Sequence, residues 1–515
     1  IKGNLTKIMA FSPITDLIKW RLKSRMASIE LMKNEPHISQ RKVLKNLLSH
    51  AENTVYGRKY RISKEMSYEE YQDAIPIVNY ESITPWIERT MKGEQNLLWD
   101  GPIQWFAKSS GTTNSKSKFI PVSRESLNDC HLSIGKDLLA IYTHQCPQSQ
   151  LFDGLSLRLG GSSKINDLQN ISYYGDLSAI MIQNLPFWAE WRSTPSNDIA
   201  LLEDWEEKVE KISQQVMNQN VTSLFGVPSW MLVLIRHILS LNGSESISSI
   251  WPNLELFCHG GVSFTPYSES FKNLLPDNCK FLETYNASEG FFAVQDRLGE
   301  PGMLLMLDHG VYYEFIPLDE FNGRTSKAIN LEKVKTDLEY AVIISTNGGL
   351  WRYILGDTIK FTSLHPYRIE VTGRTRHFIN AFGEELIIEN ADRAMISACK
   401  KTNSEIIDYT VAPLFMKGKK NGAHEWLIEF AIEPNNYQNF AIALDNELKK
   451  LNSDYGAKRH KNMILRLPII IKAEPNTFHK WLKSKGKLGG QNKVPRLSND
   501  RKLMEEILKF KLSKT

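Results

Sequence analysis

The stretch TSLFGVPSWMLVLIRHILSLN (residues 222–242), followed by LELFCHGG (254–261), decides the fold class. Thr222–Phe225 and Leu254–Cys258 are short apolar runs of the kind found in buried strands. Between them, Trp230–Leu241 carries apolar residues at helical spacing. A strand, a helix and a second strand in succession, joined by turns with Gly, Ser and Pro, indicate an α/β arrangement.

The same alternation extends outward along the chain. Pro13–Glu35 has the pattern of a basic amphipathic helix that packs on the body, and Asp204–Asn218 is a second helical segment. Ile103–Ala107 and Lys280–Tyr285 resemble strands. We therefore expect residues 1–372 to form one large α/β N-terminal domain.

After about Arg368 the pattern changes to a shorter series of elements. After a strand at the boundary, the expected order is a helix, two strands joined by a turn, a further helix and a last strand. This α-β-β-α-β order is typical of a small two-layer α+β domain of split βαβ type, which we expect over residues 373–515. The segments are Ile369–Thr372, Glu389–Lys400, Ile406–Phe415, Glu425–Ile432, Tyr437–Leu451 and Pro468–Ala473.

Composition and charge restrict the possible functions. The 515 residues are 42% hydrophobic and 23% charged, which excludes a largely disordered chain. The net charge is +5, and residues 472–515 alone hold 12 Lys and Arg against 4 Asp and Glu, or +8. This segment suits a polyanionic ligand, an acidic surface or nucleic acid, and a solvated basic tail fits equally well.

Cysteine spacing and hydropathy indicate the compartment. The five cysteines are odd in number and none forms a C-x-x-C pair, which argues against a zinc site or a secreted disulfide framework. The longest apolar runs are too short to span a bilayer, and no signal-peptide pattern opens the sequence. We expect a soluble cytoplasmic protein with no membrane span.

The first motif is KSSGTTNSKSK (residues 108–118), directly after the Ile103–Ala107 strand. Gly111 allows a tight turn whose backbone N–H groups can converge on an anion, and hydroxyls and lysines surround that turn. The loop lacks the Walker sequence, so it is a candidate phosphate cradle of another type. A Ser/Thr-rich surface turn has the same composition.

Two motifs follow strands in the second half of the large domain. His259-Gly260-Gly261 removes side chains where a flat ring could lie against the backbone. In YNASEG (residues 285–290), Tyr285 offers an aromatic face and Glu289 an oxygen ligand suited to Mg²⁺. The same segment nearly matches a nucleophile elbow centred on Ser288, but FFAV after it reads as a strand rather than the helix an elbow requires.

Three later motifs complete the series. RYILGD (residues 352–357) places Asp357 where a strand-end carboxylate could accept bonds from ribose hydroxyls. TGRTR and NAFGEE lie near the domain boundary, at residues 372–376 and 380–385. GGQNKVPR (489–496) is a glycine-led loop that could bring one lysine over an anionic site, although a basic linker would look the same.

The order of these motifs resembles the superfamily of adenylate-forming enzymes, and more closely the auxin-responsive-promoter family of acyl acid–amido synthetases. SSGTT (109–113), YNASEG and RYILGD are similar to the three nucleotide motifs of that family, and FGVPSWM (225–231), NAFGEE and QNKVPR also match. The resemblance covers nearly the whole chain and implies a luciferase-like architecture, with a bacterial member of the family as the expected origin.

The resemblance implies a reaction in which a carboxylate is adenylated by MgATP and the acyl group passes to an amine such as an amino acid. Glu289 would bind Mg²⁺, Lys493 would be the catalytic cation, and Asp357 and Arg374 would hold the ribose. The small domain would act as a mobile lid. The remaining expected ATP-binding residues are Ser109, Ser110, Gly111, Thr112, Thr113, Lys118, Gly260, Gly261, Tyr285, Asn286, Ala287 and Ser288. An aromatic-rich stretch could line the acyl pocket or belong to the core: Tyr173, Tyr174, Gly175, Asp176, Phe187 and Trp188.

Two alternatives stay open at this stage. An acyl-CoA ligase would share the adenylate intermediate and transfer the acyl group to a thiol instead of an amine. A non-catalytic protein could bind nucleotides or nucleic acid through the basic terminus, although no stable nucleic-acid complex is expected from the motifs. The identities of the acid and the amine and the oligomeric state do not follow from the sequence.

Overall fold

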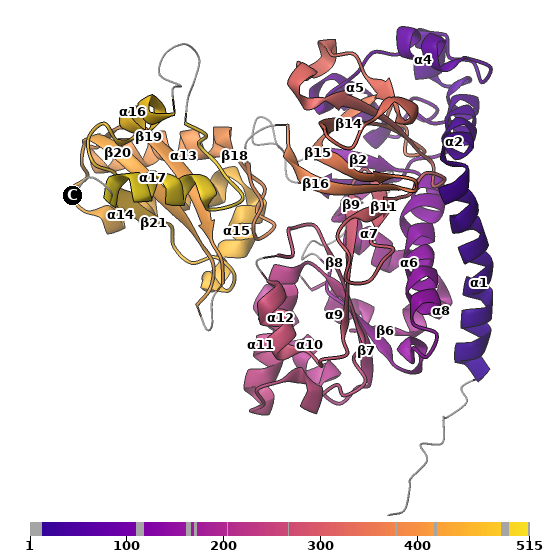
Figure 1. Cartoon of the computed structure of the whole chain (residues 1–515), viewed down its shortest axis with the longest axis horizontal. Helices are drawn as coiled ribbons and strands as arrows, with labels where there is room; N and C mark the ends of the chain where they lie inside the picture. Colours follow the sequence, from indigo (N-terminus) through magenta and orange to yellow (C-terminus); the bar gives the residue numbers. More distant parts are fainter. Residues whose placement is uncertain are drawn as a thin grey trace, which may run out of the picture.

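The computed structural model describes residues 13–109, 118–160, 166–168, 172–202, 204–265, 267–375, 378–416, 420–485 and 494–512. Figure 1 shows a larger body built from the first three quarters of the chain and a smaller body, coloured orange to yellow, beside it. Within the described ranges, no helix has both the length and the apolar character needed to cross a membrane.

A mixed sheet of twelve strands runs through the larger body. Its strands pair in parallel from β9 to β6, and antiparallel along the rest of the sheet. In spatial order the strands are β13 (Ile329–Asn330), β12 (Val311–Pro317), β14 (Glu339–Thr346), β15 (Tyr353–Leu364), β16 (Tyr367–Arg374), β11 (Met303–Leu305), β10 (Gly290–Val294), β9 (Lys280–Ala287), β8 (Leu256–Gly260), β7 (Val221–Gly226), β3 (Leu155–Arg158) and β6 (Ser193–Thr194).

Helices cover both faces of the parallel part of this sheet. Cys258 on β8 packs in the core with α6 (Leu132–Gln145), whereas its neighbour Phe257 packs on the side of α11 (Pro228–Asn242). Successive residues of a strand point to opposite faces, so an apolar run such as LFC can fill both cores. The strand–helix–strand prediction for residues 222–261 is therefore confirmed.

The remaining elements of the larger body surround this sheet. The predicted N-terminal helix, α1 (Pro13–Asn34), packs along α6 through buried Leu22, Ile29 and Met32. A separate four-stranded sheet has the order β2 (Lys118–Val122), β1 (Trp105–Ser109), β5 (Ser172–Gly175) and β4 (Asn166–Leu168). The other helices are α2 (Pro36–Ala51), α3 (Val55–Tyr60), α4 (Tyr68–Ala74), α5 (Tyr80–Met91), α7 (Leu177–Gln183), α8 (Phe187–Trp191), α9 (Asn197–Ala200), α10 (Trp205–Val216) and α12 (Ser268–Leu274).

The smaller body contains a three-stranded sheet with helices on both faces. Trp426 on the central strand packs with α13 and α14, and the next residue, Leu427, packs with α16 and α17. The elements are β17 (Phe378–Ile379), β18 (Leu386–Ile387), α13 (Ile388–Thr402), β19 (Glu405–Leu414), β20 (Ala423–Ile432), α14 (Tyr437–Leu451), α15 (Ser453–Arg459), β21 (Ile469–Lys472), α16 (Thr477–Ser484) and α17 (Lys502–Leu512). The predicted order of α13, β19, β20, α14 and β21 is confirmed.

The basic C-terminal segment is not a solvated tail, because two of its stretches form helices packed on the sheet. Phe478 and Trp481 of α16, with Met504 and Ile507 of α17, are buried against the sheet. Their basic residues lie between these apolar positions, which is why the composition concealed the helices. The expected two-layer arrangement thus gains a third layer.

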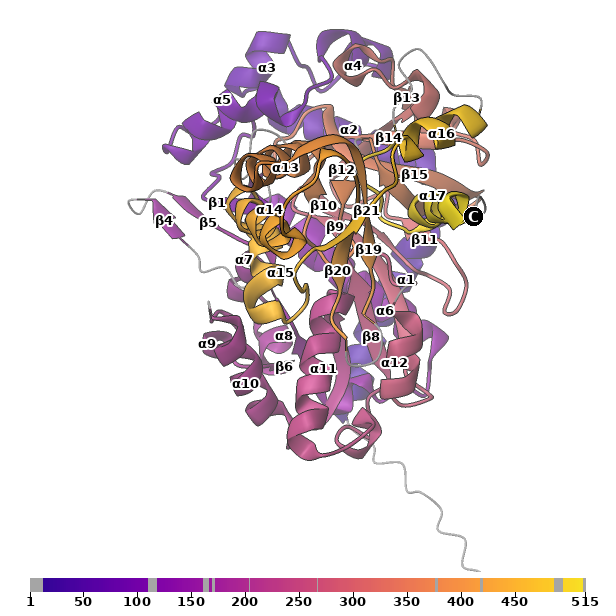
Figure 2. The ribbon, with the colours of Figure 1, turned by 90° about the vertical axis from the view of Figure 1, so that its left-hand side faces the viewer.

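The smaller body contacts the larger one through the segment NAFGEE. The Asn380 side-chain amide donates to the Gly261 carbonyl at 3.1 Å, and the Ser229 hydroxyl donates to the Phe382 carbonyl at 3.1 Å. The Tyr267 hydroxyl donates to the carbonyl of Ala381 at 2.6 Å. Figure 2, in which the smaller body faces the viewer, shows it lying over the ends of the central strands. NAFGEE is therefore fixed against the end of β8.

Candidate active site

The motif YNASEG forms the turn of the β9–β10 hairpin. Ala287 pairs with Gly290, which leaves Ser288 and Glu289 as a two-residue connection. Glu289 is buried, with 9% of its surface exposed. Because the chain continues as β10 and not as a helix, the segment lacks the strand–turn–helix geometry of a nucleophile elbow. The structure therefore argues against a Ser288 hydrolase.

Asp357 and Arg374 form an ion pair between two neighbouring strands, with Asp357 buried and Arg374 half-buried. They are directly opposite each other on β15 and β16, and the Arg374 Nε lies 2.8 Å from the Asp357 Oδ1. The Tyr285 hydroxyl donates to the second carboxylate oxygen of Asp357 at 2.7 Å. Asp357 lies within β15 and not at a strand end, which corrects that part of the expectation. Tyr285 is itself buried, so its ring is mostly covered by protein.

The charge of Arg374 is stabilised by two carboxylates. Burial alone would lower the pKa of Arg374, but the carboxylates of Asp357 and Glu385 outweigh this effect and raise it. Arg374 Nη2 lies 3.6 Å from Glu385 Oε1. Glu385 belongs to NAFGEE, so the smaller body contributes a charge directly to this site.

The Tyr353 hydroxyl lies between the side chains of Lys118 and Glu289. The ammonium of Lys118 contacts the Tyr353 hydroxyl at 3.5 Å, and that hydroxyl lies 3.5 Å from Glu289 Oε1. Burial raises the pKa of Glu289, and the positive charges of Lys118 and Arg374 partly offset this effect. Burial likewise lowers the pKa of Lys118, with Glu289 acting in the opposite direction. We call Lys118, Glu289, Asp357, Arg374 and Glu385 the ion cluster.

The predicted phosphate loop begins and ends beside this cluster. Ser109 at the end of β1 pairs with Lys118 at the start of β2, so the chain leaves and re-enters the sheet at adjacent positions. Ser110, Gly111, Thr112 and Thr113 lie outside the described residues, as does Lys493. Their expected roles therefore stay predictions.

The two glycines at the end of β8 have different structural reasons. A Cβ on Gly260 would lie 2.5 Å from the carbonyl oxygen of Thr284, and Gly261 has a φ of +81°. Close strand packing thus explains Gly260, and the left-handed backbone conformation explains Gly261, without reference to a bound ring. Both glycines, together with Thr284 and Asn286, also line a cavity.

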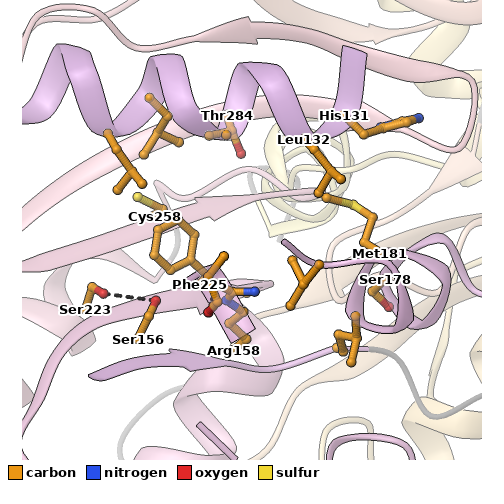
Figure 3. A pocket seen from close by; sticks show the side chains of 18 of the residues that line it. His131, Leu132, Ser156, Arg158, Ser178, Met181, Ser223, Phe225, Cys258 and Thr284 are labelled. Atoms are coloured by element: carbon orange, nitrogen blue, oxygen red, sulfur yellow. Dashed lines mark hydrogen bonds between the residues drawn. The ribbon is translucent and has the colours of Figure 1, made fainter. Parts of the chain in front are cut away.

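This cavity has a volume of about 420 Å³ and lies between the parallel strands and helices α6, α7 and α8. Figure 3 shows Ser156, Ser223, Phe225 and Cys258 on its strand side and Met181 across from them. Most lining side chains are apolar, including Leu132, Leu138, Leu139, Leu151, Phe152, Met181, Ile182, Leu185, Phe225 and Phe291. A cavity of this size and character suits the body of an apolar acid.

The expected aromatic stretch does not form this cavity as a unit. Of its six residues only Trp188 is among those lining the space. Tyr173 packs on Trp105 with ring centroids 5.1 Å apart, and Tyr174 packs on Phe119 at 5.2 Å. Phe187 is 82% exposed. Sequence reasoning missed the residues of α6 and β3 that line the cavity, among them Arg158.

Three domain models of one protein family match this chain. The GH3 family N-terminal domain matches residues 25–280, the GH3 family central domain matches 304–374, and the GH3 family C-terminal domain matches 389–502. The chain belongs to the GH3 family. This confirms the resemblance inferred from the motifs.

Individual GH3 relatives are distant but extend over most of the chain. Jasmonoyl–L-amino acid synthetase JAR6 of Nicotiana attenuata is 23% identical, over 89% of this chain and 90% of its own length. Indole-3-acetic acid-amido synthetase GH3.3 of Arabidopsis thaliana is 23% identical, over 98% of this chain and 96% of its own.

Solved structures show the same architecture. AtGH3.15 acyl acid amido synthetase in complex with 2,4-DB superimposes with a TM-score of 0.62 at 16% identity, covering 95% of this chain and 96% of that one. 2-Hydroxyisobutyryl-CoA ligase in complex with 2-HIB-AMP and CoA gives a TM-score of 0.54 at 13% identity, covering 94% and 93%. The GH3 chain described here therefore has the adenylate-forming fold predicted from its sequence.

Proposed function

We propose that this GH3 protein is an ATP-dependent acyl acid–amido synthetase. The carboxylate of an acid attacks the α-phosphorus of ATP and releases pyrophosphate, and the amine of an amino acid then attacks the acyl carbon to give an amide and AMP. The observation that carries the proposal is the ion cluster, in which three segments far apart in the sequence, namely β2, the β9–β10 turn and the β15–β16 hairpin, bring Lys118, Glu289, Asp357 and Arg374 together. The relatives named as amido synthetases support the amine as acceptor.

Within this proposal, Asp357 and Arg374 bind the ribose of ATP. Asp357 already accepts hydrogen bonds from Arg374 and Tyr285, so its carboxylate is held rigidly before a nucleotide arrives. Each carboxylate oxygen can accept more than one hydrogen bond, which leaves acceptor positions for ribose hydroxyls. Such a preorganised contact lowers the cost of positioning ATP for attack.

Glu289 fits a magnesium ion that is shared with phosphates. Within the described residues, no three His, Cys, Asp or Glu side chains gather into a metal-binding group. Mg²⁺ commonly uses only one or two carboxylates and takes its other ligands from phosphates and water, so one buried carboxylate is sufficient. The ion would neutralise charge on the phosphates, while Lys118 supplies a second positive charge from the protein.

The motifs suggest which residues hold the phosphates and the adenine, which lysine stabilises the reacting groups, and which domain is the lid. Lys493 bridges the α-phosphate and the attacking carboxylate, and Ser109, Ser110, Gly111, Thr112 and Thr113 hold the phosphates. Gly260, Gly261 and Tyr285 frame the adenine, with Asn286, Ala287 and Ser288 beside it. Residues 373–515 form the lid domain, which changes position between the two half-reactions.

We also propose that the reaction takes place in the cytoplasm. All five cysteines are unpaired in the structure, which suits a reducing compartment. MgATP and free amino acids are available there as substrates.

The decisive experiment mixes the protein with MgATP, pooled carboxylic acids and pooled amino acids, and identifies products by mass spectrometry. We expect an amide, AMP and pyrophosphate in equal amounts. A parallel reaction with coenzyme A in place of amino acids tests the acyl-CoA ligase alternative, which predicts a thioester. Absence of any acid-dependent conversion of ATP to AMP would refute adenylation altogether.

A further inference from the structure

Arg158 is a cation in the cavity wall that has no carboxylate partner among the described residues. It lies at the end of β3, and its guanidinium donates to the Ala189 carbonyl at 3.1 Å. In the described part of the chain no Asp or Glu pairs with it. A guanidinium carries five N–H donors, so the one backbone carbonyl found among the described residues leaves most of them available. Figure 3 shows Arg158 beside Phe225 on the strand side of the cavity.

Burial lowers the pKa of Arg158 to about 10. This value is still well above neutral pH, so the side chain stays charged under ordinary conditions. A buried charge without a counter-ion is costly, because the protein interior solvates it less well than water does. An anion that enters the cavity would remove this cost.

The charges around the cavity have one sign. Among the described lining residues the charged side chains are Lys136, Arg158 and Arg192, and none is Asp or Glu. Arg192 is already engaged, since it donates to the Gly154 carbonyl and lies 5.8 Å from the centroid of the Phe152 ring. The rest of the wall is mostly apolar, so Arg158 is a basic group within a largely apolar space.

The position of Arg158 places this anion far from the expected nucleotide. β3 is two strands away from β8, which carries Gly260, and three away from β9, which carries Asn286. With neighbouring strands about 4.8 Å apart, these separations are roughly 10 and 14 Å. A carboxylate undergoing adenylation must lie beside the nucleotide at the Gly260 and Asn286 end, so Arg158 faces a different part of the substrate.

We propose that Arg158 selects acids that carry a second anionic group at the far end of an apolar body, such as dicarboxylic acids. The inference rests on the proposed adenylation and specifies the acid it acts on. The apolar walls bind the body of the acid, the end near Gly260 receives the reacting carboxylate, and Arg158 pairs with the second carboxylate. The α-carboxylate of an amino acid acceptor is also an anion that could pair with Arg158. Measuring adenylation without any amino acid distinguishes the two possibilities, because adenylation requires only the acid and ATP.

The test compares Arg158→Met with the wild type, using acids that differ only in the second carboxylate. The pairs are terephthalate with 4-methylbenzoate, and suberate with octanoate. Acid-dependent pyrophosphate release is measured with MgATP and without any amino acid. We expect the wild type to have a kcat/KM at least ten-fold higher for the dicarboxylate of one pair, and Arg158→Met to lose that preference while retaining turnover of the monocarboxylate. Arg158→Lys, which keeps the charge, should retain part of the preference.

Two controls keep the outcomes separate. Arg236 is also partly buried and its guanidinium lies 4.0 Å from the Met416 sulfur, away from the cavity, so Arg236→Met should leave the ratio between the two acids unchanged. Terephthalate and suberate binding is also measured by calorimetry without ATP. Binding that depends on Arg158 without any pyrophosphate release would support the anion site and refute adenylation.

Three results would overturn the role of Arg158. The wild type could activate both acids of each pair equally, or Arg158→Met could reduce turnover of both acids by the same factor. The variant could instead leave pyrophosphate release unchanged and raise only the KM of the amino acid in amide formation, which would assign Arg158 to the acceptor. In each of these cases adenylation itself would still be demonstrated by the release of pyrophosphate.

Discussion

The ion cluster and the cavity differ in whether their charged side chains are paired with opposite charges. In the ion cluster, Arg374 lies against Asp357 and Glu385, and the charge of Lys118 offsets that of Glu289. In the cavity wall, the partner of Arg158 within the described ranges is a backbone carbonyl. A site whose charges are paired within the protein is held in place before the substrate arrives, whereas an unpaired charge indicates which group the substrate must supply. A site with paired charges, such as the ion cluster, is appropriate for a reaction step that a whole family shares. A site with an unpaired charge, such as the cavity wall, is appropriate for selecting a particular substrate.

The largest expected effect comes from removing the ion pair that anchors RYILGD, the motif that contains Asp357 of the ion cluster. Arg352, at the start of RYILGD, donates to the two carboxylate oxygens of buried Glu314 at 2.8 and 3.0 Å. Glu314→Gln leaves a buried guanidinium uncompensated, and we expect it to lower the free energy of unfolding by about 3–5 kcal/mol. Urea denaturation followed by circular dichroism measures the loss. Glu65→Gln is the control, since Glu65 pairs with Lys45 at the surface and should have almost no effect. A loss from Glu314→Gln as small as that of the control would contradict the prediction.

Removing one charge from the ion cluster should affect catalysis more than stability. We expect Asp357→Asn to reduce acid-dependent pyrophosphate release by about 10³-fold, because the ribose loses its acceptor and Arg374 loses its main partner. The control is Glu370→Gln, which breaks the exposed pair with Lys360 on the same two strands. If both variants had similar activity, Asp357 would not bind the nucleotide.

The role proposed for Lys493 concerns the transfer step and not the binding of ATP. We expect Lys493→Ala to bind ATP nearly as well as the wild type, yet to release pyrophosphate about 10²-fold more slowly, because only the transition-state charge loses its partner. Equilibrium binding of a non-hydrolysable ATP analogue and rapid-quench measurement of pyrophosphate separate the two effects. Lys487→Ala in the same segment is the matched control. Unchanged pyrophosphate release in Lys493→Ala would remove Lys493 from the mechanism.

These two regions also differ in how much the sequence revealed. YNASEG and RYILGD each follow a strand signal and contain the two carboxylates that the structure brings into the ion cluster, so Glu289 and Asp357 could be selected from the sequence. The contact of Tyr285 with Asp357 could not be predicted, because it depends on how β9 and β15 lie in three dimensions. Helix α14 was predicted with its observed bounds, since its apolar spacing is regular.

The cavity was not predictable in the same way. Its walls come from β3, β7, β8, β9 and three helices, and these segments share no local motif. A signal for Arg158 nevertheless exists in LSLRLGG (155–161), where Ser156 and Arg158 alternate with buried Leu157 and Leu159. A polar face on a strand inside a covered sheet indicates a cavity or a ligand on that side. Composition and spacing alone had drawn attention to an aromatic stretch instead.

The smallest expected effect concerns a buried cation that does have its partner, His309. Its Nε2 lies 2.8 Å from Asp137 Oδ2 and its Nδ1 lies 3.0 Å from the Asp129 carbonyl, so both ring nitrogens face acceptors. Arg25 from α1 completes the group through Asp137. Burial alone would lower the pKa of His309, but Asp137 and Asp308 outweigh it and raise the pKa.

A raised histidine pKa makes part of the stability depend on pH. The contribution is fully present below the unfolded pKa of about 6.5 and is lost as pH rises through the higher folded pKa, at about 1.4 kcal/mol for each unit between them. We expect the difference in free energy of unfolding between wild type and His309→Gln to be largest near pH 5.5 and to shrink toward pH 9. The exposed His144, replaced in the same way, should give no such trend. A difference that stayed constant over this range would mean that His309 is neutral in the folded protein, so that Arg25 alone would offset Asp137. The paired cation to compare with Arg158 would then be Arg25, because His309 would carry no charge beside Asp137.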